Sequence, residues 1–132
     1  MTSVITHTTR VTWAGTGGLD ITGTVAKTAD AEQNRILAIA GTTPDQQFDL
    51  DFPFADLQSI FLLSNIALKI ETNAADAAGG DTINLAANVP FTWTKLCGQA
   101  NPFTVDVATI FVSPVGAVAG QLDIRVLYDS AA

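Results

Sequence analysis

Charged residues are scarce in this chain of 132 residues. They make up 14% of the sequence, against about 25% in an average soluble protein, while apolar residues make up 48%. So few charges cannot cover a large free surface, and we expect other protein to cover part of it. The six Lys and Arg residues are scattered, and the formal net charge is −7. Because nucleic-acid contacts use basic residues to displace phosphate counterions, the composition argues against a nucleic-acid partner.

Cysteine and histidine each occur only once, as Cys97 and His7. A single cysteine excludes an intrachain disulfide, and a single histidine excludes a His-rich zinc site within one chain. His7 lies in a threonine-rich segment, so we interpret it as a structural or interface residue. A nucleophilic pair of Cys97 and His7 would require tertiary structure to bring them together, and no motif supports it. The sequence therefore predicts no enzyme activity and no cofactor.

Long apolar runs are also absent, as is the basic and then apolar pattern of an export signal at the N-terminus. We therefore expect no membrane partner and synthesis in the cytoplasm without export.

Two segments have a weak likeness to ligand-binding motifs. Gly15–Gly18 is glycine-rich, but it lacks the Lys-Ser/Thr pair and the helix of a phosphate-binding loop, so a β-turn is favoured. Asp45, Asp49 and Asp51 offer carboxylates of the kind that calcium binds. A solvated or intersubunit acidic face is favoured for them, and the Asp76–Asp81 loop has the same ambiguity. The sequence thus predicts no metal site.

Alternation of apolar and polar residues with a period of two recurs along the chain, whereas helical periodicity does not. Such alternation is typical of strands with one buried face. The expected strands cover residues 5–13, 19–26, 35–39, 48–52, 57–63, 66–70, 82–85, 91–95, 107–112 and 121–129. With turn signals between them, they predict a single all-β domain over residues 1–132. We expect an antiparallel β-sandwich with jelly-roll-like connections, and a small β-barrel is the alternative.

Several local details follow from the same pattern. Residues 28–32 favour a short helical turn or loop, and the apolar run 35–39 favours a buried strand. The segment 57–63 is apolar on both faces and is expected to be the most buried strand. A reversal at its end predicts that 66–70 forms a hairpin with it or continues it after a bulge. The small and polar residues of 73–81 predict an exposed loop.

Large side chains on the strand faces are candidates for contacts with another protein. Aromatic residues bury large areas both in cores and in interfaces, so sequence alone leaves the two settings open. The candidate interface residues are Ile5, His7, Val11, Trp13, Phe48, Phe52, Phe54, Phe91, Trp93, Phe103 and Tyr128. If Trp13, Trp93 and Tyr128 were exposed together beside carboxylates, they would instead favour stacking on a sugar.

The last third of the chain carries a family resemblance. Pro90-Phe-Thr-Trp93, the Asn101-Pro-Phe103 segment and the final run Gln121–Asp129, with its Leu-x-Asp, follow one another. This succession resembles the capsid decoration or cement proteins of tailed bacteriophages. The resemblance implies a non-enzymatic, homo-oligomeric virion protein that binds the major capsid protein and stabilises the shell by bridging its subunits. It also implies a place on the outer capsid surface, which suits an acidic chain.

Two other functions stay open at this point. The first is a receptor- or carbohydrate-binding module of a phage fibre or tail. The second is a self-sufficient coat subunit, which fits less well because an acidic chain without a basic arm is poorly suited to packaging a genome.

Overall fold

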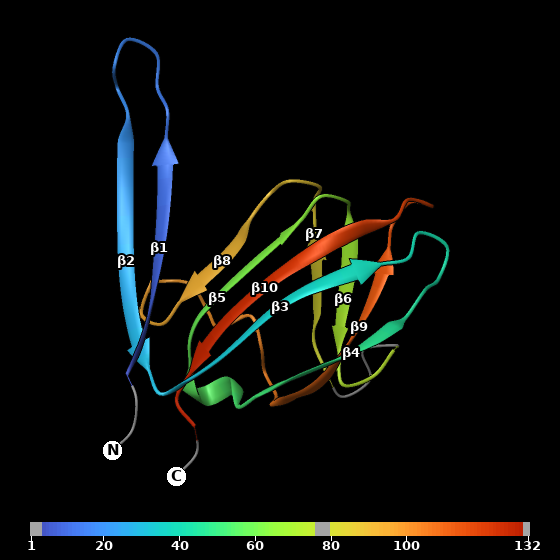
Figure 1. Cartoon of the computed structure of the whole chain (residues 1–132). Helices are drawn as coiled ribbons and strands as arrows, with labels where there is room; N and C mark the ends of the chain where they lie inside the picture. Colours follow the sequence, from blue (N-terminus) through green and yellow to red (C-terminus); the bar gives the residue numbers. More distant parts are fainter. Residues whose placement is uncertain (1–3, 76–79, 131–132) are drawn as a thin grey trace.

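The structure, a computed structural model, describes residues 4–75 and 80–130. Ten strands and one short 3-10 helix, η1 (Phe54–Asp56), make up this part of the chain. Eight strands form two four-stranded antiparallel sheets packed face to face, and the first two strands form a separate hairpin beside them (Figure 1). The prediction of an all-β antiparallel sandwich is confirmed. The alternative of a closed barrel is wrong, because the two sheets stay separate.

The strand order identifies the type of sandwich. The first sheet has the order β3 (Ala31–Ile39), β10 (Gly120–Tyr128), β5 (Leu57–Ser64), β8 (Phe91–Thr94). The second has the order β4 (Gln46–Phe52), β9 (Val107–Pro114), β6 (Leu68–Thr72), β7 (Thr82–Leu85). The antiparallel pairs are nested, since β6 pairs with β7, β5 with β8, β4 with β9, and β3 with β10. Such nesting makes one long folded hairpin of the chain, which is the arrangement of a jelly roll.

The core lies between the two sheets and is built by the alternation that the sequence displays. In β10, Ile124 and Val126 are fully buried, while Asp123 and Arg125 point to the other face. β5 lies between β10 and β8, and its Ile60 belongs to the same core. The expected cover on both faces of this strand is only partial, because Phe61 and Leu63 on its outer face are half-buried. Burying such a side chain contributes about 1.5–3 kcal/mol, so these two inner strands supply much of the stability.

The connection between the hairpin and the sandwich differs from the expected short helical turn or loop at residues 28–32. The hairpin consists of β1 (Ile5–Trp13) and β2 (Ile21–Ala29), and β3 begins directly after Asp30. Asp30 bends the chain, and its carboxylate accepts hydrogen bonds from the backbone N–H and hydroxyl of Ser130 at 2.6 and 2.8 Å. Pairing of Ala31 with Tyr128 places this segment in the sheet and overrides its weak local preference for a helical turn or loop.

The expectation of a buried strand at 35–39 is wrong. β3 is the edge strand of the first sheet, so it pairs with β10 only. Its outward-facing Ile36 is exposed, whereas Ile39 is buried. An apolar run predicts burial on both faces only where a second layer covers each face, and in β3 one face is solvent.

The connection between β5 and β6 also differs from the expectation. The two strands lie in different sheets, so they form neither a hairpin nor a bulged continuation. The crossing at Asn65 is held by its side-chain oxygen, which accepts a hydrogen bond from the backbone N–H of Gln121 at 2.8 Å. Residues 76–79 of the loop expected at 73–81 lie outside the described residues.

Within the described ranges, no helix has the length and apolar character that crossing a membrane requires.

Candidate interaction surfaces

The hairpin has two chemically distinct faces, because residues directly opposite each other in an antiparallel pair point to the same side. The nine pairs from Ile5 with Ala29 to Trp13 with Ile21 run without a bulge. One face is threonine-rich. The other, the apolar hairpin face, consists of Ile5, His7, Thr9, Val11 and Trp13 on β1 and Ile21, Gly23, Val25, Lys27 and Ala29 on β2.

The base of this apolar face rests on the outer surface of the first sheet. Val126 belongs to the core and Tyr128 packs against it, so Leu127 between them points to the outer surface of the sheet. Leu127 is nevertheless fully buried. β2 contacts both β10 and β5 there, and Ala29 at its end is buried as well. The sandwich therefore has a small second apolar contact outside its core, at the hairpin base.

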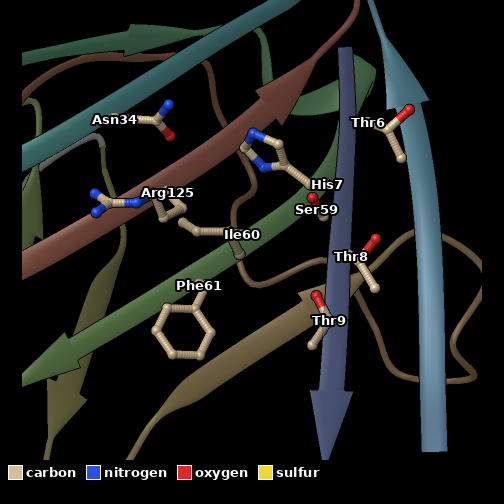
Figure 2. Close-up of a pocket in the computed structure, with 9 residues that line it drawn as sticks. All are labelled: Thr6, His7, Thr8, Thr9, Asn34, Ser59, Ile60, Phe61 and Arg125. Carbon is tan, nitrogen blue, oxygen red and sulfur yellow. The ribbon is translucent and has the colours of Figure 1, made fainter.

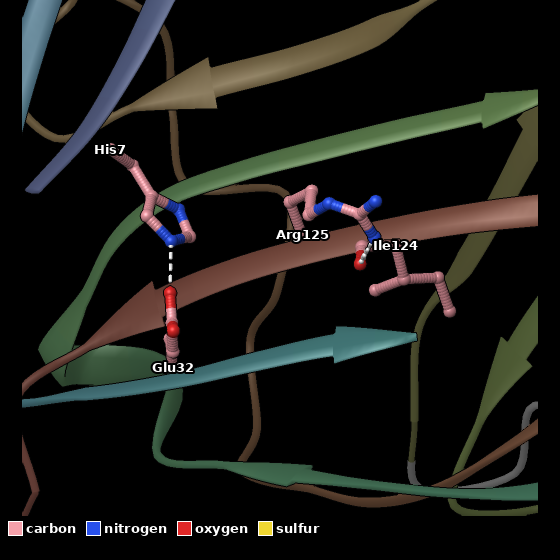
Figure 3. Close-up of polar contacts among 4 residues, drawn as sticks. All are labelled: His7, Glu32, Ile124 and Arg125. Carbon is pink, nitrogen blue, oxygen red and sulfur yellow. Dashed lines mark hydrogen bonds and ion pairs between the residues drawn. The ribbon is translucent and has the colours of Figure 1, made fainter. Parts of the chain in front are cut away.

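A hydrogen-bonded pair fastens β1 to the sheet at the same place. The Nε2 of His7 lies 2.6 Å from a carboxylate oxygen of Glu32 on β3 (Figure 3). The hydrogen bond from His7, and then one from Asn34, lower the pKa of Glu32 below its ordinary value. His7 thus serves as an anchor of the hairpin, and its Nε2 contacts Glu32 rather than Cys97.

The distal half of the apolar hairpin face extends beyond this base and is uncovered. Trp13 and Ile21, which face each other near the turn, are 72% and 70% exposed, and Val11 is exposed too. Figure 1 shows the hairpin projecting from the sandwich with its turn far from the sheets. Neighbouring large apolar side chains exposed on one face make this surface a candidate for contact with another protein.

A cleft separates the free edge of β1 from the outer surface of the first sheet (Figure 2). It has a volume of about 460 Å³. Residues 6–9 of β1 line one side, and Asn34, Phe61 and Arg125 belong to the other. The guanidinium of Arg125 donates hydrogen bonds to the backbone oxygens of Ile124 and Arg35, and it forms no ion pair with a described residue. The cleft is open, polar on its rim and apolar at Phe61.

A second exposed apolar surface lies at the end of the sandwich away from the hairpin base. We call it the loop end; it consists of the connections 40–45, 65–67, 86–90 and 115–119. Hydrogen bonds join these connections to one another and to β5: the backbone N–H of Val115 donates to the oxygen of Ala67, and that of Asn88 donates to the oxygen of Ser64, the last residue of β5. The backbone at Gly41 approaches Val118 so closely that a Cβ there would clash. The four connections therefore form one continuous surface.

The loop end is almost free of charge. Its only ionisable residue is Asp45, and its exposed large side chains are Val89, Val115 and Val118. Val115 is 70% exposed. Three exposed valines lie among alanines, glycines and uncharged polar residues such as Thr42, Thr43 and Asn88, with one carboxylate, and this weakly charged surface is suited to contact with protein.

The opposite end of the sandwich is acidic, and its carboxylates have structural partners. Asp81 accepts hydrogen bonds from the backbone N–H and hydroxyl of Thr104 at 2.9 and 2.8 Å. Asp106 accepts one from the backbone N–H of Phe54 at 3.1 Å. No group of three His, Cys, Asp or Glu residues in the described ranges has the geometry of a metal site. These acids tie loops together instead.

The structure places most of the candidate interface residues in or against the core. Phe52, Trp93 and Phe103 are buried, and the rings of Phe52 and Phe103 pack edge to face with their centres 5.1 Å apart. The indole N–H of Trp93 donates to the backbone oxygen of Gln99 at 3.0 Å. Partly buried and packed against the same core are Phe48, Phe54, Phe91 and Tyr128.

The remaining candidates lie on the hairpin, where Ile5 and His7 form its base, and Val11 and Trp13 its exposed part. A platform of Trp13, Trp93 and Tyr128 for sugar stacking does not form, because Trp93 is buried. The sequence reasoning missed the loop end. Its signal is the lack of charge shared by four separate connections, which becomes visible only once the strand order brings them together.

Comparison of the chain with protein-family models, curated proteins and solved structures found no match.

Proposed function

We propose that this protein is a structural component of a virus particle that binds the outer surface of the capsid and stabilises the shell by bridging capsid subunits. The observation that carries the proposal is the loop end, an exposed and nearly uncharged apolar surface at one end of a rigid jelly roll. The partner in this proposal is the major capsid protein, and the docking surface is the loop end.

Three features support this function. Jelly rolls occur among viral capsid domains, although they also occur in lectins and cupins, so the fold supports the proposal by analogy only. The resemblance of residues 90–129 to decoration proteins points the same way. Finally, a ligand that binds only the assembled shell stabilises it by mass action, which requires no catalytic group and no cofactor.

The acidity of the rest of the chain fits an outward orientation. With the loop end on the shell, the acidic opposite end and the hairpin would face solvent, away from the packaged nucleic acid. Repulsion between acidic bodies would then oppose nonspecific crowding of neighbouring copies on the capsid.

The test is binding to empty capsids of tailed phages. We expect saturable, stoichiometric binding in cosedimentation and a higher disruption temperature of the capsids. The variant Val115→Asp should weaken binding at least about tenfold, because it buries a carboxylate in the contact. Leu96→Asp is the matched control, since Leu96 is exposed in the connection between β8 and β9, away from the loop end.

Two results would count against the proposal. Absence of capsid binding contradicts the function, and equal loss of binding in both variants contradicts the assignment of the docking surface. Retention on a glycan array without capsid binding would favour the receptor- or carbohydrate-binding module, for which the exposed Trp13 is the specific observation.

A further inference from the structure

The uncovered half of the apolar hairpin face and the free edge of β1 belong to the same hairpin, and both lack a partner in the described structure. Trp13, Ile21 and Val11 expose apolar surface to water. Along one side, β1 pairs with β2, and along the other its backbone N–H and C=O groups meet no strand in the described structure. A partner that pairs with β1 would satisfy its backbone groups and cover its apolar face at once.

Nothing in the sequence of β1 blocks such pairing. Natural edge strands are protected by proline, bulges or inward-pointing charges, yet Ile5–Trp13 has no proline, its register with β2 is continuous, and Arg10 is its only Lys, Arg, Asp or Glu residue. Figure 2 shows that the free edge of β1 faces the side of the cleft that carries Phe61 and Arg125. An added strand would therefore lie next to the cleft.

Charge favours a second copy of this chain as the partner. The first 29 residues contain two basic residues and one acidic residue, for a formal charge of +1. The remaining residues contain four basic and twelve acidic residues, for a formal charge of −8. A hairpin that lies against another copy's sandwich thus meets a body of opposite charge, which favours its docking and its orientation.

We propose that two copies of the chain form a twofold-symmetric dimer in which their β1 strands pair antiparallel along their free edges. Pairing is most extensive when the symmetry axis passes beside Thr9, the middle residue of Ile5–Trp13. In this register all nine residues find a partner, and Trp13 of each copy lies opposite Ile5 of the other. Arg10 lies opposite Thr8, so the two arginines do not face each other.

In the same register, side chains of the second copy fill the cleft. The antiparallel arrangement brings the distal half of each hairpin beside the base of the other, where the cleft opens. Val11 and Trp13 of one copy then cover Phe61 and Arg125 of the other. Arginine beneath an indole ring is a favourable contact, and Arg125 forms no ion pair with a described residue that would compete. This inference does not rest on capsid binding.

The first experiment is sedimentation equilibrium of the wild-type protein at up to about 100 µM, where a Kd of about 1 µM leaves mostly dimer. We expect a dimer, and we expect Trp13→Asp to raise the Kd at least about tenfold because it places a carboxylate in the apolar contact. Val115→Asp, the same kind of change at an exposed site on the loop end, should leave the Kd unchanged. A monomeric wild-type protein would overturn the proposal.

The second experiment fixes the edge that pairs. In a Cys97→Ser background, Thr9→Cys places two cysteines directly opposite each other, about 4.5–5.5 Å apart at Cα, within reach of a disulfide. We expect a disulfide-linked dimer under mild oxidation. Val25, the partner of Thr9 on β2, lies one strand further from the axis, so Val25→Cys should not cross-link. Cross-linking through Val25 and not through Thr9 would show that β2 pairs and would refute this arrangement.

Loss of dimerisation and loss of capsid binding are separate outcomes. The two experiments above contain no capsid, and the loop-end variant Val115→Asp should still dimerise. A protein that dimerises without binding capsids would refute the proposed function alone, and a monomer that binds capsids would refute this inference alone.

Discussion

The hairpin and the jelly roll are both antiparallel β-structure with apolar and polar residues in alternation, but only the jelly roll covers its apolar face. Its two sheets give each other a second layer, so Ile124 of β10 is fully buried. The hairpin has two strands and no layer of its own beyond its base, so Ile21 stays 70% exposed. The same pattern of residues thus makes a core in one region and an exposed apolar surface in the other. A two-stranded ribbon is marginally stable alone, which is why its base is fastened to the sandwich.

The largest expected difference between the two regions concerns these same two isoleucines. Ile124→Ala should lower the free energy of unfolding by about 2–5 kcal/mol, because it leaves a cavity between the sheets. Ile21→Ala should change it by less than about 0.5 kcal/mol, since the side chain is mostly in water. Urea denaturation at low protein concentration measures both. A large effect of Ile21→Ala under monomeric conditions would show that the hairpin face packs against the sandwich after all.

A smaller difference concerns two lysines. On β6, the Nζ of Lys69 lies 3.1 Å from a carboxylate oxygen of Glu71, whose side chain is nearly buried. Lys69→Ala removes the partner of that carboxylate and should lower the free energy of unfolding by about 1–2 kcal/mol. Lys27→Ala on the hairpin removes no ion pair with a described residue and should have an effect below about 0.5 kcal/mol. Thermal and urea denaturation of the two variants compare them. Equal effects would mean that the ion pair contributes little.

The smallest effect is a pH dependence confined to the hairpin. The hydrogen bond from His7 lowers the pKa of Glu32, so the ionised carboxylate stabilises the docked hairpin above the ordinary Glu pKa. This contribution is lost as the pH falls through the lowered pKa, and we expect residues 5–13 to gain mobility there. Backbone relaxation measured by NMR should detect the change in β1 and none in β10. In Glu32→Gln the hairpin should be loosened at every pH, and an unchanged acid transition in that variant would contradict the assignment to Glu32.

The sequence predicted the strands and the class of fold because period-two alternation is a local property. Phe48, Leu50 and Phe52 alternate with polar residues, and the structure turns all three toward the core side of β4. The failures occurred where a neighbour in space decides the outcome. The run 35–39 looks buried, but β3 lies at an edge, and 66–70 looks like the partner of 57–63, but β6 crosses to the other sheet.

The candidate surfaces were less predictable than the fold. Aromatic residues such as Phe103 and Trp93 are common in interfaces, but in this structure they lie in the core, where the nearest apolar side chains are. Nothing in the sequence marks the exposed valines of the loop end individually, since each is a single valine in a short connection: Val89, Val115 and Val118. Their joint exposure depends on the nesting of four strand pairs, and no periodicity in the sequence encodes that nesting.

By itself, the sequence determined that the chain forms antiparallel strands, that it lacks the clustered groups of a disulfide or zinc framework, and that its charge lies mainly after residue 29. These properties follow from residue types and from spacings of a few positions. Only the tertiary structure decided which apolar faces meet. Two sheets of similar size cover each other, whereas the hairpin from Ile5 to Ala29 extends past the body and keeps Trp13 and Ile21 in water. The physical reason is that burial requires a second surface, and the position of that surface depends on the whole chain.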